Sequence, residues 1–200
     1  MRGRALTPTL GERDARAVVR AIRGGDLVLL PVDTVYGIAC DPDDRAAVER
    51  LYRLKGRPAD KPSALMAFAL ADALELAPDL GARTRAAVER LLPGPVGVLV
   101  PGPDGTTLGL RVPDLPWLAG SGLVVLQSSA NLAGEPDAAR LADVPRSIRE
   151  GCDLVLDGGE LPGLPSTLVD LTALEADGGW RIVREGLSGA DAVGAALAGA

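Results

Sequence analysis

Two cations near the end of the first third of the chain, Lys55 and Arg57, have types and spacing that suggest chemistry. Of the 21 basic residues only Lys55 and Lys61 are lysines, and they lie within seven positions of each other. Lysine is a compact point charge that suits a phosphate oxygen, whereas arginine offers a planar fork for carboxylate or phosphate. We therefore expect this segment to bind an anion, and a solvated basic loop is the alternative.

Other polar residues follow or interrupt apolar runs. Arg111 lies inside a run of Leu, Gly and Val, where a buried charge needs an anionic partner, so it either faces solvent or holds a ligand. Ser129 and Asn131 follow an apolar run, and Ser166 follows a loop rich in glycine and proline. Such hydroxyl and amide groups can hydrogen-bond a ligand, although Ser and Asn also serve routinely in turns and helix caps.

Composition excludes several classes of protein. Histidine is absent, which rules out a Ser-His-Asp triad, a Cys-His pair and an HExxH zinc site. Neither lysine follows a glycine and no GxGxxG motif occurs, so the common phosphate-binding loops are missing. The formal charge of −6 and the 2% aromatic content disfavour a broad nucleic-acid surface, although a local basic cleft is compatible with them.

The hydrophobic pattern predicts an α/β fold in which helices and strands alternate. Helices are expected over 14–23, 44–54, 71–76, 83–92, 143–150 and 188–198, with a helical turn from Pro116. Strands are expected over 27–32, 63–68, 96–100, 108–112, 123–127, 152–157, 168–170 and 180–184, with 96–100 and 108–112 as an antiparallel pair. Residues 33–37 are expected to form a polar turn that leads to the helix at 44–54.

Local signals mark several ends of these elements. Asp44 is the expected N-cap and Gly56 the expected end of the second helix, which delivers Lys55 to its last turn. Ser188 and Asp191 have the spacing of a capping box for the last helix. No repeat or linker is apparent, so residues 1–200 are expected to form one domain.

The cysteines and the N-terminus bear on the compartment. Cys40 and Cys152 form no CxxC motif and are expected to be free thiols. The N-terminus lacks the apolar region of a signal peptide, and no run approaches the ~18 apolar residues of a membrane span. A cytoplasmic protein with no membrane partner is therefore expected.

Seven short motifs occur in an order that resembles the YrdC/YciO family. They are DTVYG at 33–37, KGRP at 55–58, LPGP at 92–95, LRVP at 110–113, SAN at 129–131, ST at 166–167 and REG at 184–186. The resemblance implies a single YrdC-like domain with a twisted mixed sheet, flanking helices and a concave basic cleft. Its core would span about 14–186, followed by the helix at 188–198.

The resemblance also implies an activity. Relatives of this kind are L-threonylcarbamoyladenylate synthases, which form threonylcarbamoyl-AMP and pyrophosphate from L-threonine, bicarbonate and ATP with Mg²⁺. Catalysis of this type depends on positioning and charge neutralisation rather than on a covalent nucleophile. Downstream tRNA-modifying transferase proteins would use the product to make threonylcarbamoyladenosine, and direct binding of tRNA is left open.

By the resemblance, the site residues divide into two groups. Thr34, Arg111 and Ser166 would hold threonine, with the fork of Arg111 on its carboxylate. ATP and its phosphates would be held by Lys55, Arg57, Ser129, Asn131 and Arg184, of which Lys55 and Arg57 would also be catalytic.

Three positions depart from the family pattern, and two other functions compete. Lys61 replaces a common Asn, Ser128 a common Pro, and Met66 a His that contacts threonine in some relatives; Met66 is expected in the core. The leading alternative is an RNA-binding or ribosome-associated module on the same fold. Carbamoyl-transfer relatives of hydrogenase maturation are a further alternative, but they carry zinc-finger motifs that this sequence lacks.

Overall fold

The computed structural model describes residues 10–56 and 63–198. The helices of this part of the chain are α1 (Glu12–Arg23), α2 (Arg45–Lys55), α3 (Leu70–Glu75), α4 (Ala82–Leu91), α5 (Arg146–Gly151), α6 (Leu174–Asp177) and α7 (Ala190–Leu197), with 3-10 turns η1 (Pro103–Gly105) and η2 (Leu141–Asp143). The strands are β1 (Val28–Pro31), β2 (Tyr36–Cys40), β3 (Ala64–Ala67), β4 (Val96–Pro101), β5 (Thr107–Arg111), β6 (Val124–Ser129), β7 (Leu154–Val155), β8 (Thr167–Asp170) and β9 (Arg181–Arg184).

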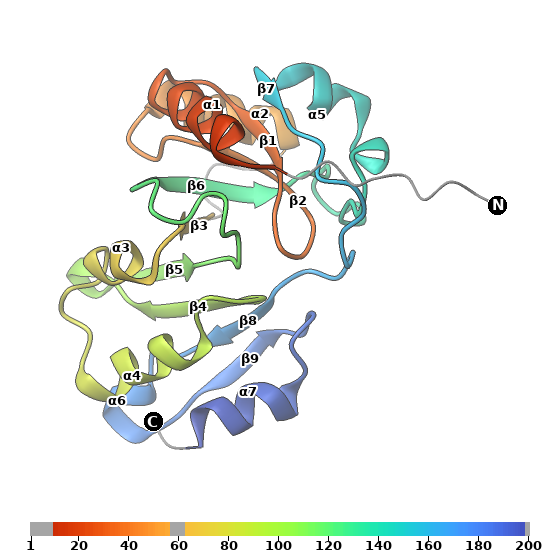
Figure 1. Ribbon diagram of the computed structural model, residues 1–200. Helices are drawn as coiled ribbons and strands as arrows, with labels where there is room; N and C mark the ends of the chain where they lie inside the picture. Colours follow the sequence, from red (N-terminus) through yellow and green to blue (C-terminus); the bar gives the residue numbers. More distant parts are fainter. Residues whose placement is uncertain (1–9, 57–62, 199–200) are drawn as a thin grey trace.

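The described strands form one sheet in the order β7-β1-β2-β6-β3-β5-β4-β8-β9 (Figure 1). Neighbouring strands are antiparallel except for the parallel pairs β1/β7, β3/β5 and β4/β8. Helices α1, α2 and α5 lie near the β7 end, and α4, α6 and α7 lie near the β9 end. The predicted mixed sheet with flanking helices is confirmed, as is the antiparallel pair β4/β5.

Each face of the sheet buries its own apolar layer, because successive strand residues point to opposite faces. On one face, α1 packs Val18 and Ile22 against Val28 of β1 and Met66 of β3, which confirms Met66 as a core residue. On the other face, α2 and α5 cover the β7 end, and α3, α4 and α7 cover the rest. Among the described residues, the α1 cluster does not extend to β4, β8 or β9, so a cavity can form on that face.

The largest difference from the sequence prediction is strand β2, which was not predicted. β1 and β2 pair as an antiparallel hairpin, with Leu30 opposite Gly37 and Pro31 opposite Tyr36. All five residues of β2 are buried, so the strand lacks the polar–apolar alternation by which a half-buried strand is recognised. Residues 33–35 therefore lie in a hairpin turn, and no helix follows that turn directly.

Helix α2 begins and ends as predicted. The side chain of Asp44 accepts hydrogen bonds from the backbone N–H groups of Ala46 and Ala47, and Gly56 ends the helix in the left-handed conformation with a φ of 60°. Lys55 is the last residue of α2, two residues after solvent-exposed Arg53. Arg57 and Lys61, the other cations of the predicted anion-binding segment, lie outside the described residues.

Two predicted helix starts are wrong. The capping box at Ser188 does not form: the N-cap of α7 is Gly189, and the carbonyl of Ser188 instead accepts a hydrogen bond from Thr167 Oγ1. Helix α5 begins only after Pro145, its N-cap residue, and η2 occupies the preceding turn. At Ser188, a contact with a residue distant in sequence outweighs the local pattern. At Pro145, the fixed φ of proline does so.

The predicted helical turn from Pro116 forms, because the N–H groups of Leu118 and Ala119 both donate to the carbonyl of Leu115, although the turn does not continue into a helix. Two shorter elements differ from prediction. Strand β7 keeps only two residues of the predicted 152–157, and α6 was not predicted. Within the described ranges, no helix has the length and apolar character needed to cross a bilayer.

Cys40 and Cys152 are both free, as predicted. Burial, with a smaller contribution from the charge of Asp41 or Asp153, raises the pKa of each thiol to about 12. Since only the thiolate reacts, at pH 8 about one thiol in 10⁴ is reactive, and the folded protein should alkylate very slowly.

Mass spectrometry after alkylation in denaturant without reductant should count two labels. A mass low by two hydrogens and no label would contradict this expectation.

Candidate functional site

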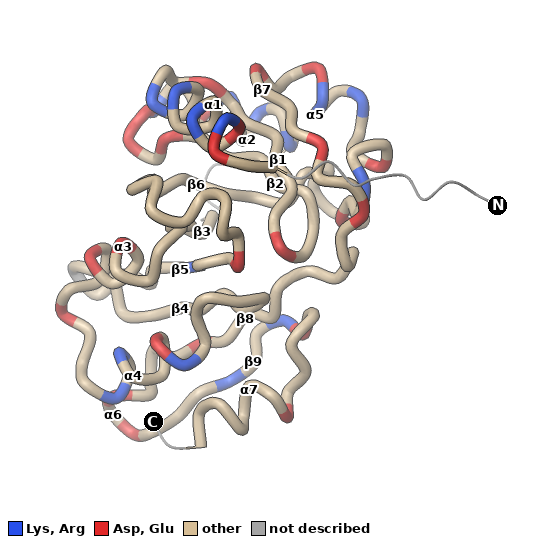
Figure 2. Tube along the Cα trace, viewed as in Figure 1, with Lys and Arg blue, Asp and Glu red and all other residues tan. Residues whose placement is uncertain are grey.

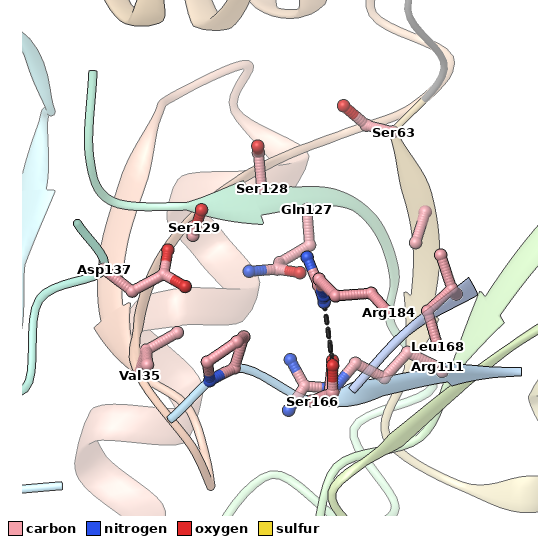
Figure 3. Close-up of a pocket in the computed structure, with 13 residues that line it drawn as sticks. Val35, Ser63, Arg111, Gln127, Ser128, Ser129, Asp137, Ser166, Leu168 and Arg184 are labelled. Carbon is pink, nitrogen blue, oxygen red and sulfur yellow. Dashed lines mark hydrogen bonds between the residues drawn. The ribbon is translucent and has the colours of Figure 1, made fainter. Parts of the chain in front are cut away.

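Figure 3 shows the residues that line a cavity of about 220 Å³. The cavity lies on the α1 face of the sheet, because Arg111, which lines it, is paired with Met66 of the α1 cluster. Residues of β3, β4, β5, β6, β8 and β9 line it, together with Val35, Asp137 and Pro165 from loops. Four of the eight predicted site residues reach it: Arg111, Ser129, Ser166 and Arg184. Figure 2 shows Lys and Arg positions on β5 and β9, strands that border the cavity.

Arg111 ends β5 and is only 5% exposed. Its Nη2 donates to the carboxylate of Asp33 and, at 2.9 Å, to Oγ1 of Thr34. Asp33 is itself fixed, because its Oδ2 accepts from the backbone N–H of Asp114 at 3.2 Å. The β1–β2 hairpin turn therefore clamps one side of the guanidinium, which resolves how a charge can lie inside an apolar strand.

The same guanidinium retains capacity to bind a ligand. Its Nε is buried and has no hydrogen-bond partner in the part of the chain that the structure describes. A buried donor without a partner costs free energy, so a ligand atom that accepts from it would be favoured. Arg111 is thus oriented by Asp33 and Thr34 and can still engage a ligand in the cavity.

Burial shifts the pKa of both members of the Asp33–Arg111 pair toward the neutral form. Burial raises the pKa of Asp33, and the charge of Arg111 opposes that rise. Burial lowers the pKa of Arg111; Asp33 opposes the change, and the nearby charge of Arg184 adds to it. Two guanidinium groups that repel each other across one cavity favour an anionic ligand between them.

Arg184, at the end of β9, is held against the start of β8. Its Nη2 donates to the backbone carbonyl of Ser166 at 2.9 Å and to the Ser166 hydroxyl at 3.4 Å. The backbone N–H of Leu187 donates to the carbonyl of Pro165 at 2.8 Å, which closes the same corner. Ser166 and Arg184 are therefore joined directly at this wall of the cavity.

Lys55 supports the loop after β6. It is 3% exposed, and its Nζ donates to the backbone carbonyl of Ser129 and to Oδ1 of Asn131 at 3.1 Å. The Ser129 hydroxyl donates to the same Asn131 oxygen at 2.6 Å, and the Asn131 amide donates to the carbonyl of Glu135. Of these residues Ser129 lines the cavity, whereas Lys55 places its positive charge behind the loop.

Thr34 and Asn131 are buried: Thr34 supports Arg111, and Asn131 supports the loop after β6. Arg57 lies outside the described residues. Sequence reasoning did not assign roles to Asp33, Gln127 or Asp137. A charged residue in an apolar strand signals a buried counter-ion, but the sequence does not say that Asp33 supplies it. Gln127 and Asp137 reach the cavity only through strand pairing and a loop path.

A metal ion was expected with the nucleotide. Within residues 10–56 and 63–198, no group of three or more His, Cys, Asp or Glu side chains could hold one. Mg²⁺ that enters on phosphates keeps most of its waters and needs only one or two carboxylates. Asp137 is the one acidic residue among those that line the cavity, and its carboxylate fits that limited demand.

Two curated bacterial relatives match this chain over most of their own length. The chain is 38% identical to the "Threonylcarbamoyl-AMP synthase" of Chromohalobacter salexigens over 172 residues, covering 78% of this chain and 92% of that protein. It is 35% identical to the protein of the same name from Nitrosococcus oceani over 156 residues, covering 72% of this chain and 84% of the relative.

Solved structures and a family model agree with these relatives. P. abyssi Sua5 complexed with L-threonine has a TM-score of 0.82 at 25% identity over 94% of this chain. A double variant of P. abyssi Sua5 has a TM-score of 0.84 at 26% identity over 95% of it. This chain covers only 58% and 61% of those two chains. The Sua5/YciO/YrdC family model, described as "Telomere recombination", matches residues 20–186. The chain belongs to the Sua5/YciO/YrdC family.

Proposed function

We propose that this chain is a threonylcarbamoyl-AMP synthase, an enzyme that makes threonylcarbamoyl-AMP and pyrophosphate from L-threonine, bicarbonate and ATP. The observation that carries the proposal is one cavity that joins a fixed, buried arginine to a hydroxyl-bearing loop and a second arginine. Such a cavity can bind a carboxylate at one end and phosphates at the other. The relatives that share this name support the same activity.

Arg111 and Ser166 form the proposed amino-acid end. The planar fork of Arg111 suits the threonine carboxylate, and its unpartnered Nε provides a donor for it. Thr34 has no exposed surface, so in this proposal it acts by orienting Arg111. A preoriented guanidinium loses little freedom when the ligand binds, which favours affinity for a small substrate.

Ser129 and Arg184 form the proposed phosphate end, backed by Lys55 and Asn131, and Arg57 is proposed to add charge from the neighbouring segment. The threonine amine captures bicarbonate as a carbamate with loss of water. A carbamate oxygen then attacks the α-phosphorus of ATP, and the bond to pyrophosphate breaks with its electrons on the leaving group. These steps need alignment and charge neutralisation rather than a covalent enzyme intermediate.

Mg²⁺ bound with ATP would supply further charge neutralisation on the leaving pyrophosphate, and Asp137 is the residue of the cavity that could hold it. In the cell we expect the mixed anhydride to pass to a tRNA-modifying transferase, because such a product is hydrolytically labile. We propose that this transfer takes place in the cytoplasm.

Substitution of Lys55 should lower kcat/KM for ATP more than kcat/KM for threonine. Lys55→Met keeps the length of the side chain but removes both its charge and its hydrogen bonds to Ser129 and Asn131. Losing a charged, buried hydrogen-bonding group costs about 2–3 kcal/mol, so kcat/KM for ATP should fall about 30–100-fold. Steady-state rates of pyrophosphate release, with thermal melting to confirm folding, measure this. A wild-type ATP dependence would remove Lys55 from the nucleotide site.

The proposed function is tested by omission. Pyrophosphate should appear only when threonine, bicarbonate, ATP and a divalent cation are all present, because the attacking carbamate forms only from amine and bicarbonate. RNA should not be required. Serine should react more weakly than threonine, because one missing methyl group is worth only about 1–3 kcal/mol. Absence of pyrophosphate from the full mixture, with tight salt-sensitive binding to RNA, would favour the RNA-binding alternative.

A further inference from the structure

Gln127 is a buried polar residue of the cavity that the proposed site does not yet use. It is 7% exposed and lines the cavity from β6. Its carboxamide makes no hydrogen bond to any other residue that the structure describes. A carboxamide has two donors and an acceptor, and neither Nε2 nor Oε1 of Gln127 is among the polar atoms cut off from solvent without a partner, so the group is open to the cavity that it lines. The cavity side of this group is therefore suited to a polar ligand.

Gly37 provides the space for this carboxamide. Strand β2 runs antiparallel to β6, with Gly37 opposite Ser129 and Ala39 opposite Gln127. A Cβ atom added at Gly37 would lie 2.4 Å from Nε2 of Gln127, far inside van der Waals contact, and 3.1 Å from Val32. The bare backbone of Gly37 is thus the surface on which the amide rests.

The position of Gln127 relates it to both ends of the proposed site. Figure 3 shows its carboxamide reaching between Ser129 on one side and Arg111, Ser166 and Arg184 on the other. Gln127 and Ser129 are two residues apart on β6, so their side chains share one face of the sheet. A substrate with a carboxylate at Arg111 and a phosphate at Ser129 would occupy the same cavity that Gln127 lines.

We propose that Gln127 binds the carboxyl group derived from bicarbonate, donating an Nε2 hydrogen to one of its oxygens. This inference rests on the proposed function. In the reaction, the amine nitrogen forms a bond to the bicarbonate carbon and water leaves. One carbamate oxygen then bonds to the α-phosphorus as pyrophosphate departs. That carboxyl group is the one part of the product that lies between amino acid and phosphate.

A neutral amide suits this task for an electrostatic reason. The two guanidinium groups already supply positive charge to the cavity: burial lowers the pKa of Arg111, and the charge of Arg184 adds to that lowering. A third cation would increase that repulsion, whereas an amide N–H orients an oxygen without adding charge. The amide also leaves the second carbamate oxygen free to attack, because it needs to hold only the first.

The test measures the KM of each substrate in turn by pyrophosphate release, in buffer depleted of carbon dioxide and with the other two substrates saturating. Gln127→Ala should raise the KM for bicarbonate about 3–10-fold, the effect of one lost hydrogen bond. The KM values for threonine and ATP should stay within about twofold of wild type. Ser63→Ala is the matched control, since the Ser63 hydroxyl also borders the cavity without a partner among the described residues.

Gly37→Ala provides a second, independent variant. Its added Cβ would displace the amide of Gln127, so the KM for bicarbonate should rise although Gln127 is intact. In a double-mutant cycle with Gln127→Ala, Gly37→Ala should add little, because the group it displaces is gone. Additive effects on the bicarbonate KM would contradict the inference.

The outcomes separate this inference from the proposed function. Wild-type protein that releases no pyrophosphate from the full mixture overturns both. Wild-type turnover with an unchanged bicarbonate KM in Gln127→Ala overturns only the role of Gln127. A rise confined to the threonine or ATP KM would also overturn it, since the amide would then contact another part of the substrates.

Discussion

Arg111→Lys should leave the protein folded but lower kcat/KM for threonine about 100-fold, mainly through a higher KM. A buried, hydrogen-bonded charge contact at a binding site is worth about 2–5 kcal/mol when one side is changed. Arg111 contacts Asp33 and Thr34 through Nη2 and keeps Nε for a ligand. An ammonium group is a point charge and cannot reproduce that fork.

Arg111→Ala should also destabilise the fold. It leaves the buried carboxylate of Asp33 without its counter-ion, which typically costs about 3–5 kcal/mol. Arg181→Lys is the matched control, because Arg181 also pairs with an aspartate, Asp170, but its own side chain is 77% exposed. Initial rates against threonine concentration, together with thermal melts, measure both effects. An unchanged threonine dependence in Arg111→Lys would place Arg111 outside the amino-acid site.

Gly186→Ala should damage both the fold and the site. A Cβ at Gly186 would lie 2.2 Å from the carbonyl oxygen of Pro165, 2.6 Å from the carbonyl carbon of Ser166 and 2.7 Å from the nitrogen of Thr167. All three are backbone atoms, which cannot rotate away as a side chain can. The segment after β9 would have to move away from β8, and Arg184 would move relative to Ser166.

The expected cost is on the order of 2–3 kcal/mol in the free energy of unfolding, the upper part of the range for overpacking. Catalysis should fall as well. The value of kcat/KM should be reduced for both threonine and ATP, because Ser166 belongs to the proposed amino-acid end and Arg184 to the proposed phosphate end. Gly109→Ala is the matched control in β5, where the added Cβ would come no closer than 3.5 Å to any atom. Wild-type stability and rates in Gly186→Ala would show that this corner of the cavity is not rigid.

The sequence predicted correctly the ends of those elements that are fixed by residues close to them in the chain. Helix α2 begins at Asp44 and ends at Gly56 because a side-chain cap and a left-handed glycine act within a few residues. Strand β2 was missed because both of its faces are buried, so its sequence has no alternation to detect. The capping box at Ser188 failed because the carbonyl of Ser188 bonds to Thr167, far away in sequence.

The candidate site divides in the same way. Motif resemblance identified Arg111, Ser129, Ser166 and Arg184, which the structure brings to one cavity. Asp33 is 78 residues from Arg111 in sequence, so only the folded hairpin brings the two together. Gln127 becomes a candidate only when β2 and β6 pair and place Gly37 beside its amide. Residues that act through pairing of distant strands carry no local signature.

The central claim is that this one cavity joins threonine, bicarbonate and ATP into a single product. The most direct measurement is mass spectrometry of the reaction products, made with ordinary and with ¹³C-labelled bicarbonate. The account predicts a product that contains both AMP and threonine and that becomes heavier by one neutron with the labelled bicarbonate. A product of AMP and threonine whose mass does not respond to the label, or no joined product while the protein binds RNA tightly at low salt, would contradict it.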